Sequence, residues 1–169
     1  ALAAETQQNN PRLLGTSVAI SGVSDLLKKL ASVKTPVLFT GESGTGKEIA
    51  ARTLHAMSDR GAKPFVAVNC ATLGAENGAD QLFGKLGPTG EVQEGLLQLA
   101  DGGVLFLDEV AELPDPIQAM LLRVLEDYKM RPISAARDVA LDLRFMFATN
   151  VDLEQAVANG KFRRDLFHR

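Results

Sequence analysis

The chain has 169 residues, a length typical of one globular domain with a sizeable buried core. Hydrophobic residues make up 46% and charged residues 23%, which excludes a disordered or fibrous chain, and the formal charge of −3 argues against a basic nucleic-acid-binding surface. Because no apolar run approaches membrane-spanning length and Cys70 is the single cysteine, we expect a cytoplasmic domain with no membrane partner and no internal disulfide.

The beginning of the chain separates into a tail and the start of a domain. Residues 1–11 are small and polar, and we expect them to form a linker or a frayed end. Apolar residues then recur at helical spacing over 20–30. One domain over 12–169, opening with an amphipathic helix, is the resulting prediction.

A glycine-rich segment from Thr40 to Glu48 lies between a short apolar run and a helix-patterned stretch. A strand, a glycine turn and a helix in this order form a phosphate-binding loop, whose backbone N–H groups and helix dipole face a polyphosphate. Lys47 would reach the β- and γ-phosphates, whereas Glu48 stands where the general motif has a magnesium-binding Ser or Thr. An unrelated glycine turn before a surface helix is the alternative. The predicted nucleotide-binding residues of this loop are Gly41, Glu42, Ser43, Gly44, Thr45, Gly46, Lys47 and Glu48.

Three later apolar runs, at 65–68, 104–107 and 143–148, predict buried strands with helical patterns between them. We expect Asp115 to cap the helix that follows the second run, with Pro116 at its first position. Strands that alternate with helices predict an α/β fold with a parallel sheet covered by helices on both faces.

The second chemical signal is the acidic pair Asp108 and Glu109 at the end of the 104–107 run. In a doubly wound sheet, the carboxyl end of this strand lies beside the phosphate loop. Asp108 could hold magnesium directly or through water, and Glu109 could polarise a water for attack on the γ-phosphate. Acidic pairs at strand ends also serve as helix caps. Alongside a phosphate loop, the pair predicts hydrolysis of a nucleotide γ-phosphate with the help of magnesium.

Several motifs together resemble the AAA+ ATPase domain of NtrC-type bacterial enhancer-binding proteins. These proteins remodel RNA polymerase that carries the enhancer-dependent sigma factor, sigma-54. The resemblance covers nearly the whole chain and implies an AAA+ P-loop NTPase fold. Its motifs lie at 41–48, 68–71, 100–109, 121–125, 148–150 and 162–169.

The same resemblance implies roles for four further residues. Asn69 would sense the nucleotide state by holding or releasing the catalytic Glu109, and Asn150 would touch the γ-phosphate or the attacking water. Arg163 and Arg169 would act as arginine fingers that complete the site of a neighbouring subunit in a ring of identical chains. On spacing alone, a solvated basic helix face is the simpler interpretation of the two arginines.

Two departures from the family bear on function. The family's sigma-contacting loop has an aromatic tip, whereas residues 85–91 offer a proline, glycines and a threonine. The family's last strand and helical lid would follow Arg169, and DNA binding would belong to domains outside this chain. We therefore expect an ATP-hydrolysing, oligomerising domain of a bacterial transcription regulator. The alternative is a nucleotide-responsive oligomerisation module of a regulator that works without sigma-54.

Overall fold

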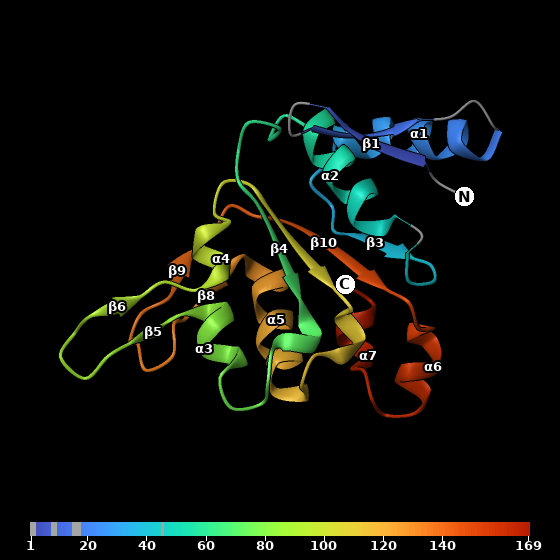
Figure 1. Cartoon of the computed structure of the whole chain (residues 1–169). Helices are drawn as coiled ribbons and strands as arrows, with labels where there is room; N and C mark the ends of the chain where they lie inside the picture. The colour runs from blue at the N-terminus through green and yellow to red at the C-terminus, as the bar shows by residue number, and fades with distance from the viewer. Residues whose placement is uncertain (1–2, 8–9, 15–17, 45) are drawn as a thin grey trace.

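A four-stranded sheet forms the centre of the molecule (Figure 1). The computed structural model describes the backbone of residues 3–7, 10–14, 18–44 and 46–169, and side chains from residue 25 onward except at 45. All pairings within the central sheet are parallel, which confirms the α/β prediction. In spatial order its strands are β3 (Val37–Thr40), β10 (Arg144–Thr149), β7 (Val104–Asp108) and β4 (Phe65–Asn69).

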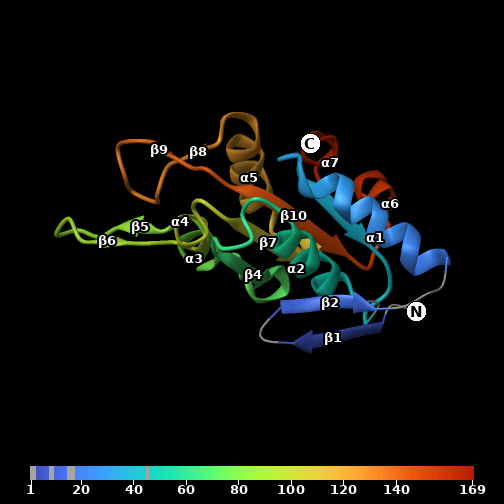
Figure 2. The ribbon, with the colours of Figure 1, turned by 90° about the horizontal axis from the view of Figure 1, so that it is seen from above.

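Helices cover both faces of this sheet, as Figure 2 shows from above. Successive side chains of a strand point to opposite faces, so Leu105 and Leu107 of β7 enter one core while Val104 and Phe106 enter the other. The smaller core packs against α1 (Val18–Ala31) and α2 (Lys47–Met57). Around the larger core lie α3 (Gly78–Phe83), α4 (Leu96–Leu99), α5 (Asp115–Asp127), α6 (Leu153–Ala158) and α7 (Arg164–Phe167). No helix in the described part of the chain is long and apolar enough to span a membrane.

Two short antiparallel hairpins extend from the larger core, and 3-10 turns follow two of the central strands (Figure 1). Leu86 N–H donates to the Ile133 carbonyl at 2.8 Å, so the β5 strand of the first hairpin is tied to the loop between β8 and β9. The hairpins are β5 (Lys85–Leu86) with β6 (Val92–Gln93) and β8 (Lys129–Met130) with β9 (Val139–Ala140), and the turns are η1 (Cys70–Thr72) and η2 (Val110–Glu112).

The start of the chain differs from the expected linker. Strand β1 (Ala3–Gln7) pairs antiparallel with β2 (Asn10–Leu14), and β2 lies against α2. Pairing between backbone groups orders these residues although their composition carries no strand-like apolar alternation. Local sequence pattern could not reveal it, because the support comes from α2, more than thirty residues later.

Helix α5 also begins differently from the prediction. The Pro114 carbonyl accepts hydrogen bonds from the N–H groups of Ile117 at 3.0 Å and Gln118 at 3.1 Å, so Pro114 occupies the capping position. Asp115 is the first helical residue, and Pro116 stands at the second, where a missing N–H removes no intrahelical bond.

The outer edge of β3 has no partner strand in the described part of the chain. Its Leu38 is 42% exposed, and an apolar groove beside it is lined by Pro36, Val37, Phe162 and Phe167 among others. One edge of the sheet thus combines open main-chain groups with exposed apolar side chains.

Candidate functional site

A cavity of about 830 Å³ opens where β3, β7 and β4 end. Its volume is in the range of small-molecule and cofactor sites. Parallel strands bring their carboxyl ends to one edge of the sheet, where open α/β folds bind ligands. The structure therefore brings together the phosphate loop, the acidic pair and one predicted sensor. The lining residues are Ser43, Gly44, Gly46, Lys47, Glu48, Ile49, Arg52, Asn69, Asp108 and Glu109.

The loop after β3 takes a shape that only glycine adopts easily. Gly44 and Gly46 have φ of 82° and 86°, in the left-handed region. A Cβ on Gly44 would meet nothing within 4 Å, so backbone conformation, and not space, accounts for glycine there. Helix α2 begins at Lys47 and directs its unpaired first N–H groups, with their partial positive charge, toward the cavity. Thr45 of the predicted loop lies outside the described residues.

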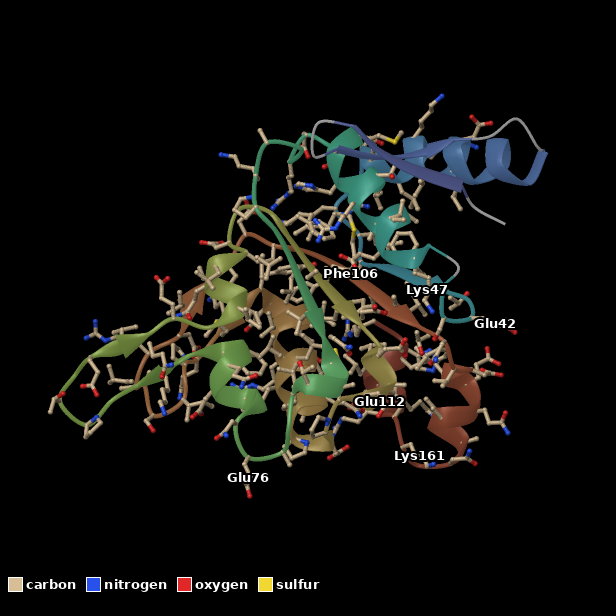
Figure 3. The ribbon with its side chains drawn as sticks, viewed as in Figure 1. Glu42, Lys47, Glu76, Phe106, Glu112 and Lys161 are labelled. Carbon is tan, nitrogen blue, oxygen red and sulfur yellow. The ribbon has the colours of Figure 1, made fainter. Side chains whose placement is uncertain are left out.

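Lys47 is held by the loop that it follows. Its Nζ lies 2.5 Å from the Gly41 carbonyl oxygen and 3.4 Å from that of Glu42, and Figure 3 labels Lys47 beside Glu42. Gly41 and Glu42 thus contact the lysine and do not line the cavity themselves. A phosphate group entering the loop would offer the ammonium a charged partner in place of these carbonyls.

The acidic pair occupies the end of β7. Asp108 Oδ1 accepts a hydrogen bond from Glu109 N–H at 2.9 Å, which fixes the carboxylate at the cavity wall. Glu109 has φ 56° and ψ 50°, a left-handed conformation that costs energy in a residue with a Cβ and is common where side chains are aimed for function. Both acids line the cavity, as the sequence predicted.

Asn69 reaches the same wall because β4 pairs with β7 in register, with Asn69 opposite Asp108. Its Oδ1 accepts from Ala71 N–H at 3.0 Å and caps the η1 turn. Because Oδ1 already accepts this bond, the side-chain NH₂ group is the part of Asn69 that could donate a hydrogen bond to a carboxylate such as that of Glu109.

Asn150 joins the site through the phosphate loop. Its Nδ2 donates to Ser43 Oγ at 3.3 Å, and Gly41 N–H donates to the Thr149 carbonyl at 3.3 Å. The end of β10 is therefore hydrogen-bonded to the loop at two points, although Asn150 itself is not among the residues that line the cavity.

The site contains a residue that sequence reasoning missed. Arg52 lines the cavity and donates from Nε at 3.0 Å and Nη2 at 2.9 Å to Glu48 Oε1. Its guanidinium also stacks on Phe65, 4.6 Å from the ring centroid. Glu48 and Arg52 are four residues apart on α2, a spacing at which opposite charges meet, and this signal could have identified the pair.

A buried thiol lies near the two acids. Cys70 is fully buried, and burial, followed by the negative charges of Asp108 and Glu109, raises the pKa of its thiol to about 12. The thiol therefore stays protonated and contributes no further negative charge to the wall that a polyphosphate approaches.

The two predicted arginine fingers lie apart from this cavity. Arg163 pairs with Asp165 through Nε at 3.1 Å and Nη2 at 3.0 Å, and Arg169 Nη2 lies 3.7 Å from Glu126 Oε1. Neither arginine lines the cavity, so the structure does not bring them to the site of their own chain.

Comparisons with known proteins give the chain a family. A family model described as the sigma-54 interaction domain matches residues 13–169. The Nif-specific regulatory protein of Rhodobacter capsulatus is 46% identical over 93% of this chain and 28% of its own length. The phenol regulator MopR of Acinetobacter guillouiae is 47% identical over 98% of this chain and 30% of its own length. This chain therefore spans about a third of the length of the relatives it matches.

Solved structures agree with the sequence matches. The crystal structure of NtrX from Brucella abortus in complex with ATP matches with a TM-score of 0.85 and 40% identity, over 93% of this chain and 36% of that one. The P-loop NTPase domain of a sigma-54 transport activator from E. coli, at 22% identity and a TM-score of 0.63, shares the fold. With an AAA+ P-loop fold and a family match over nearly its whole length, the chain belongs to the sigma-54 interaction domain family.

Proposed function

We propose that this chain binds ATP with magnesium and hydrolyses it, as the nucleotide-binding domain of a bacterial transcription regulator that assembles into a ring. The observation that carries the proposal is the convergence of Lys47, Asp108 and Glu109 on one cavity at the carboxyl edge of the sheet. The complex of the related NtrX with ATP supports it.

Phosphate binding rests on the loop and the helix that follows it. Backbone N–H groups of Gly44, Gly46 and the first turn of α2 would face the phosphates. The Lys47 ammonium would leave the carbonyls of Gly41 and Glu42 for the β- and γ-phosphate oxygens, since its bonds to charged oxygens are stronger.

The donor set of this cavity fits magnesium. Asp108 would hold the ion, because one of its oxygens is engaged by Glu109 N–H while the carboxylate lines the cavity, and magnesium prefers carboxylate and phosphate oxygens. Bound there, magnesium would neutralise charge on the phosphates. Glu48 would supply no hydroxyl to the ion, and Arg52 holds the Glu48 carboxylate by two hydrogen bonds.

Hydrolysis would use Glu109 as the base that takes a proton from the attacking water. Asn150, held at the loop by Ser43, would orient the γ-phosphate or that water, and Asn69 would hold Glu109 in the nucleotide state that does not hydrolyse. Arg163 and Arg169, which lie outside the cavity of their own chain, would complete the site of the next subunit.

Titration with a fluorescent ATP analogue tests the proposal. Lys47→Ala should remove most of the affinity while leaving the fold intact, because in the empty site the lysine contacts only backbone carbonyls of its own loop. Lys161→Ala, a change at an exposed lysine, is the matched control. Near-normal affinity in Lys47→Ala would show that the loop is not a nucleotide site.

A second candidate function follows from the β5–β6 hairpin. Between its strands lie Gly87, Pro88, Thr89, Gly90 and Glu91, and no aromatic side chain stands at the tip. Val92, 65% exposed, is the large apolar side chain that the hairpin offers to a partner. Since aromatic anchors dominate small interfaces, the chain would respond to nucleotide and oligomerise without docking on sigma-54.

A native-gel shift separates the two candidates. The chain, mixed with purified sigma-54 in ADP and aluminium fluoride, should show no stable complex if the hairpin has lost the contact. A clear nucleotide-dependent shift would instead support polymerase remodelling as the function. Val92→Ser should then weaken the shift, whereas Leu99→Ser, a change at an exposed leucine outside the hairpin, should not.

A further inference from the structure

A second cavity, of about 90 Å³, lies at the amino ends of the strands, on the edge of the sheet opposite to the nucleotide site. It forms where the end of α1, the turn after α2 and the first residue of β10 meet. Nothing in the proposed ATPase cycle uses these groups. The cavity is lined by Ser32, Val33, Lys34, Asp59, Arg60 and Arg144.

Arg144 is the unusual member of this set. It is only 1% exposed, and the one hydrogen bond that its side chain forms within the described residues runs from Nη2 to the Leu30 carbonyl at 2.7 Å. Its Nε and Nη1 are buried and have no partner among the described residues. Because buried donors in folded proteins are almost always paired with an acceptor, these two groups are the unusual feature of the cavity.

The charges around the cavity do not balance. Lys34 and Arg60 are both engaged by Asp142, to which they lie 2.7 Å and 2.5 Å away, and their hydrogen bonds lower the pKa of that carboxyl to about 2. Burial lowers the pKa of Arg144, and the negative charge of Asp59, which lines the same cavity, opposes that shift without a salt bridge between the two described side chains. Three cations therefore meet two carboxylates, and Arg144 is the cation left without a paired anion.

We propose that this cavity binds one small inorganic oxyanion of the size of phosphate. A buried charge is costly unless an opposite charge and hydrogen bonds accompany it, and an oxyanion supplies both to Nε and Nη1 of Arg144. The volume would hold roughly three water molecules. Water would satisfy the donors but would add no negative charge beside the guanidinium.

Lys34 makes the cavity accessible to an ion from solvent. Its side chain is half exposed and lines the mouth, so an anion would pass the ammonium before it reaches the buried Arg144. The Lys34 Nζ, now 2.7 Å from Asp142, would add a second charge-assisted hydrogen bond to the bound ion.

Thermal unfolding in a phosphate titration tests the site. The measurements use the Lys47→Ala chain, because the phosphate loop itself would otherwise bind the ion, and constant ionic strength is kept with a bulky sulfonate anion. We expect the melting temperature to rise and to saturate with phosphate. General exclusion of phosphate from protein surfaces also stabilises folded proteins, but it shows no saturation and does not depend on one lysine.

Two further variants, made in the same background, make the test specific. Lys34→Gln should raise the apparent dissociation constant about tenfold, as expected for the loss of one charge-assisted hydrogen bond, while Lys161→Gln should leave it unchanged. Arg144→Met, which removes the buried charge, should abolish the saturable effect. If that variant does not fold, the Lys34 and Lys161 pair still decides the matter.

Calorimetric titration of the Lys47→Ala chain with phosphate gives the stoichiometry, and one site per chain is expected. Any one of three results would overturn the proposal. The first is a melting temperature that rises without saturation, and the second is an equal response in Lys34→Gln and Lys161→Gln. The third is a crystal structure in phosphate that shows water alone beside Arg144.

Discussion

Gln118 ties helix α5 to the arginine segment, because its Oε1 accepts a hydrogen bond from Arg163 N–H at 2.9 Å. The same side chain donates from Nε2 to the Leu113 carbonyl at 2.8 Å and to the Lys161 carbonyl at 3.3 Å, and it is only 1% exposed. One buried amide therefore connects the segment after the acidic pair with the residue proposed to reach a neighbouring subunit.

Replacing this amide should loosen both segments. Gln118→Leu keeps the volume but leaves buried backbone groups of Leu113 and Arg163 without partners, so we expect a loss of roughly 1–3 kcal/mol in the free energy of unfolding. Urea unfolding measures it, with Gln81→Leu on an exposed face of α3 as the control. Equal losses in the two variants would contradict the role of the buried amide.

Glu109→Gln should separate binding from chemistry. An amide can hydrogen-bond to water but is a poor base, so ATP affinity should persist while turnover falls by roughly 10²-fold or more. Glu112→Gln, at an exposed position three residues later that Figure 3 labels, serves as the matched control. Turnover at the parent rate in Glu109→Gln would remove this residue from the mechanism.

Arginine fingers that act between subunits should reveal themselves by complementation. Arg169→Ala and Glu109→Gln should each be nearly inactive, and mixing them should restore some turnover, because some interfaces then pair an intact base with an intact finger. Activity per chain of the parent should also rise steeply with concentration. Arg164→Ala, next to Arg163 and exposed, is the control. Concentration-independent turnover without rescue would assign the arginines to a solvated helix face.

His55 should make stability depend on pH. Burial lowers its pKa below the usual 6.5, although its hydrogen bond with the Lys63 carbonyl opposes that shift. The unfolded chain therefore takes up the proton first as pH falls below about 6.5, and stability is lost through that window. Between about pH 7.5 and about pH 5.5, the unfolding free energy should fall less in His55→Gln than in the parent. The unfolding free energy of the His168→Gln control should fall as much as that of the parent. Identical losses in all three proteins would contradict this role of His55.

Local pattern was sufficient for the parts of the fold that depend on neighbouring residues. The apolar runs at 65–68 and 104–107 predicted strands that the structure contains, and the glycine spacing predicted the loop before Lys47. These features depend on side-chain alternation and on backbone freedom, which a short stretch of sequence displays directly.

Long-range contacts were beyond such reasoning. The bond from Arg163 to Gln118 spans 45 residues, and the contact of Asn150 with Ser43 spans 107. Nothing in the neighbouring sequence distinguishes Gln118 from a surface glutamine. Nothing local shows that the charged side chain of Arg144 is buried either. Tertiary packing brings these groups together, and it was the resemblance to a family, not spacing, that pointed to Asn150.

Among the described residues no strand pairs with the outer edge of β3, and this affects how self-association of these 169 residues should be interpreted. An exposed strand edge with apolar side chains beside it is a template for strand addition, in which a second chain pairs with Val37–Thr40 edge to edge. Such a dimer would increase the measured mass without placing any arginine at a neighbour's nucleotide. A Leu38→Lys change should suppress it while leaving subunit complementation intact. Rescue of turnover, and not particle mass, is therefore the measurement that identifies a working ring.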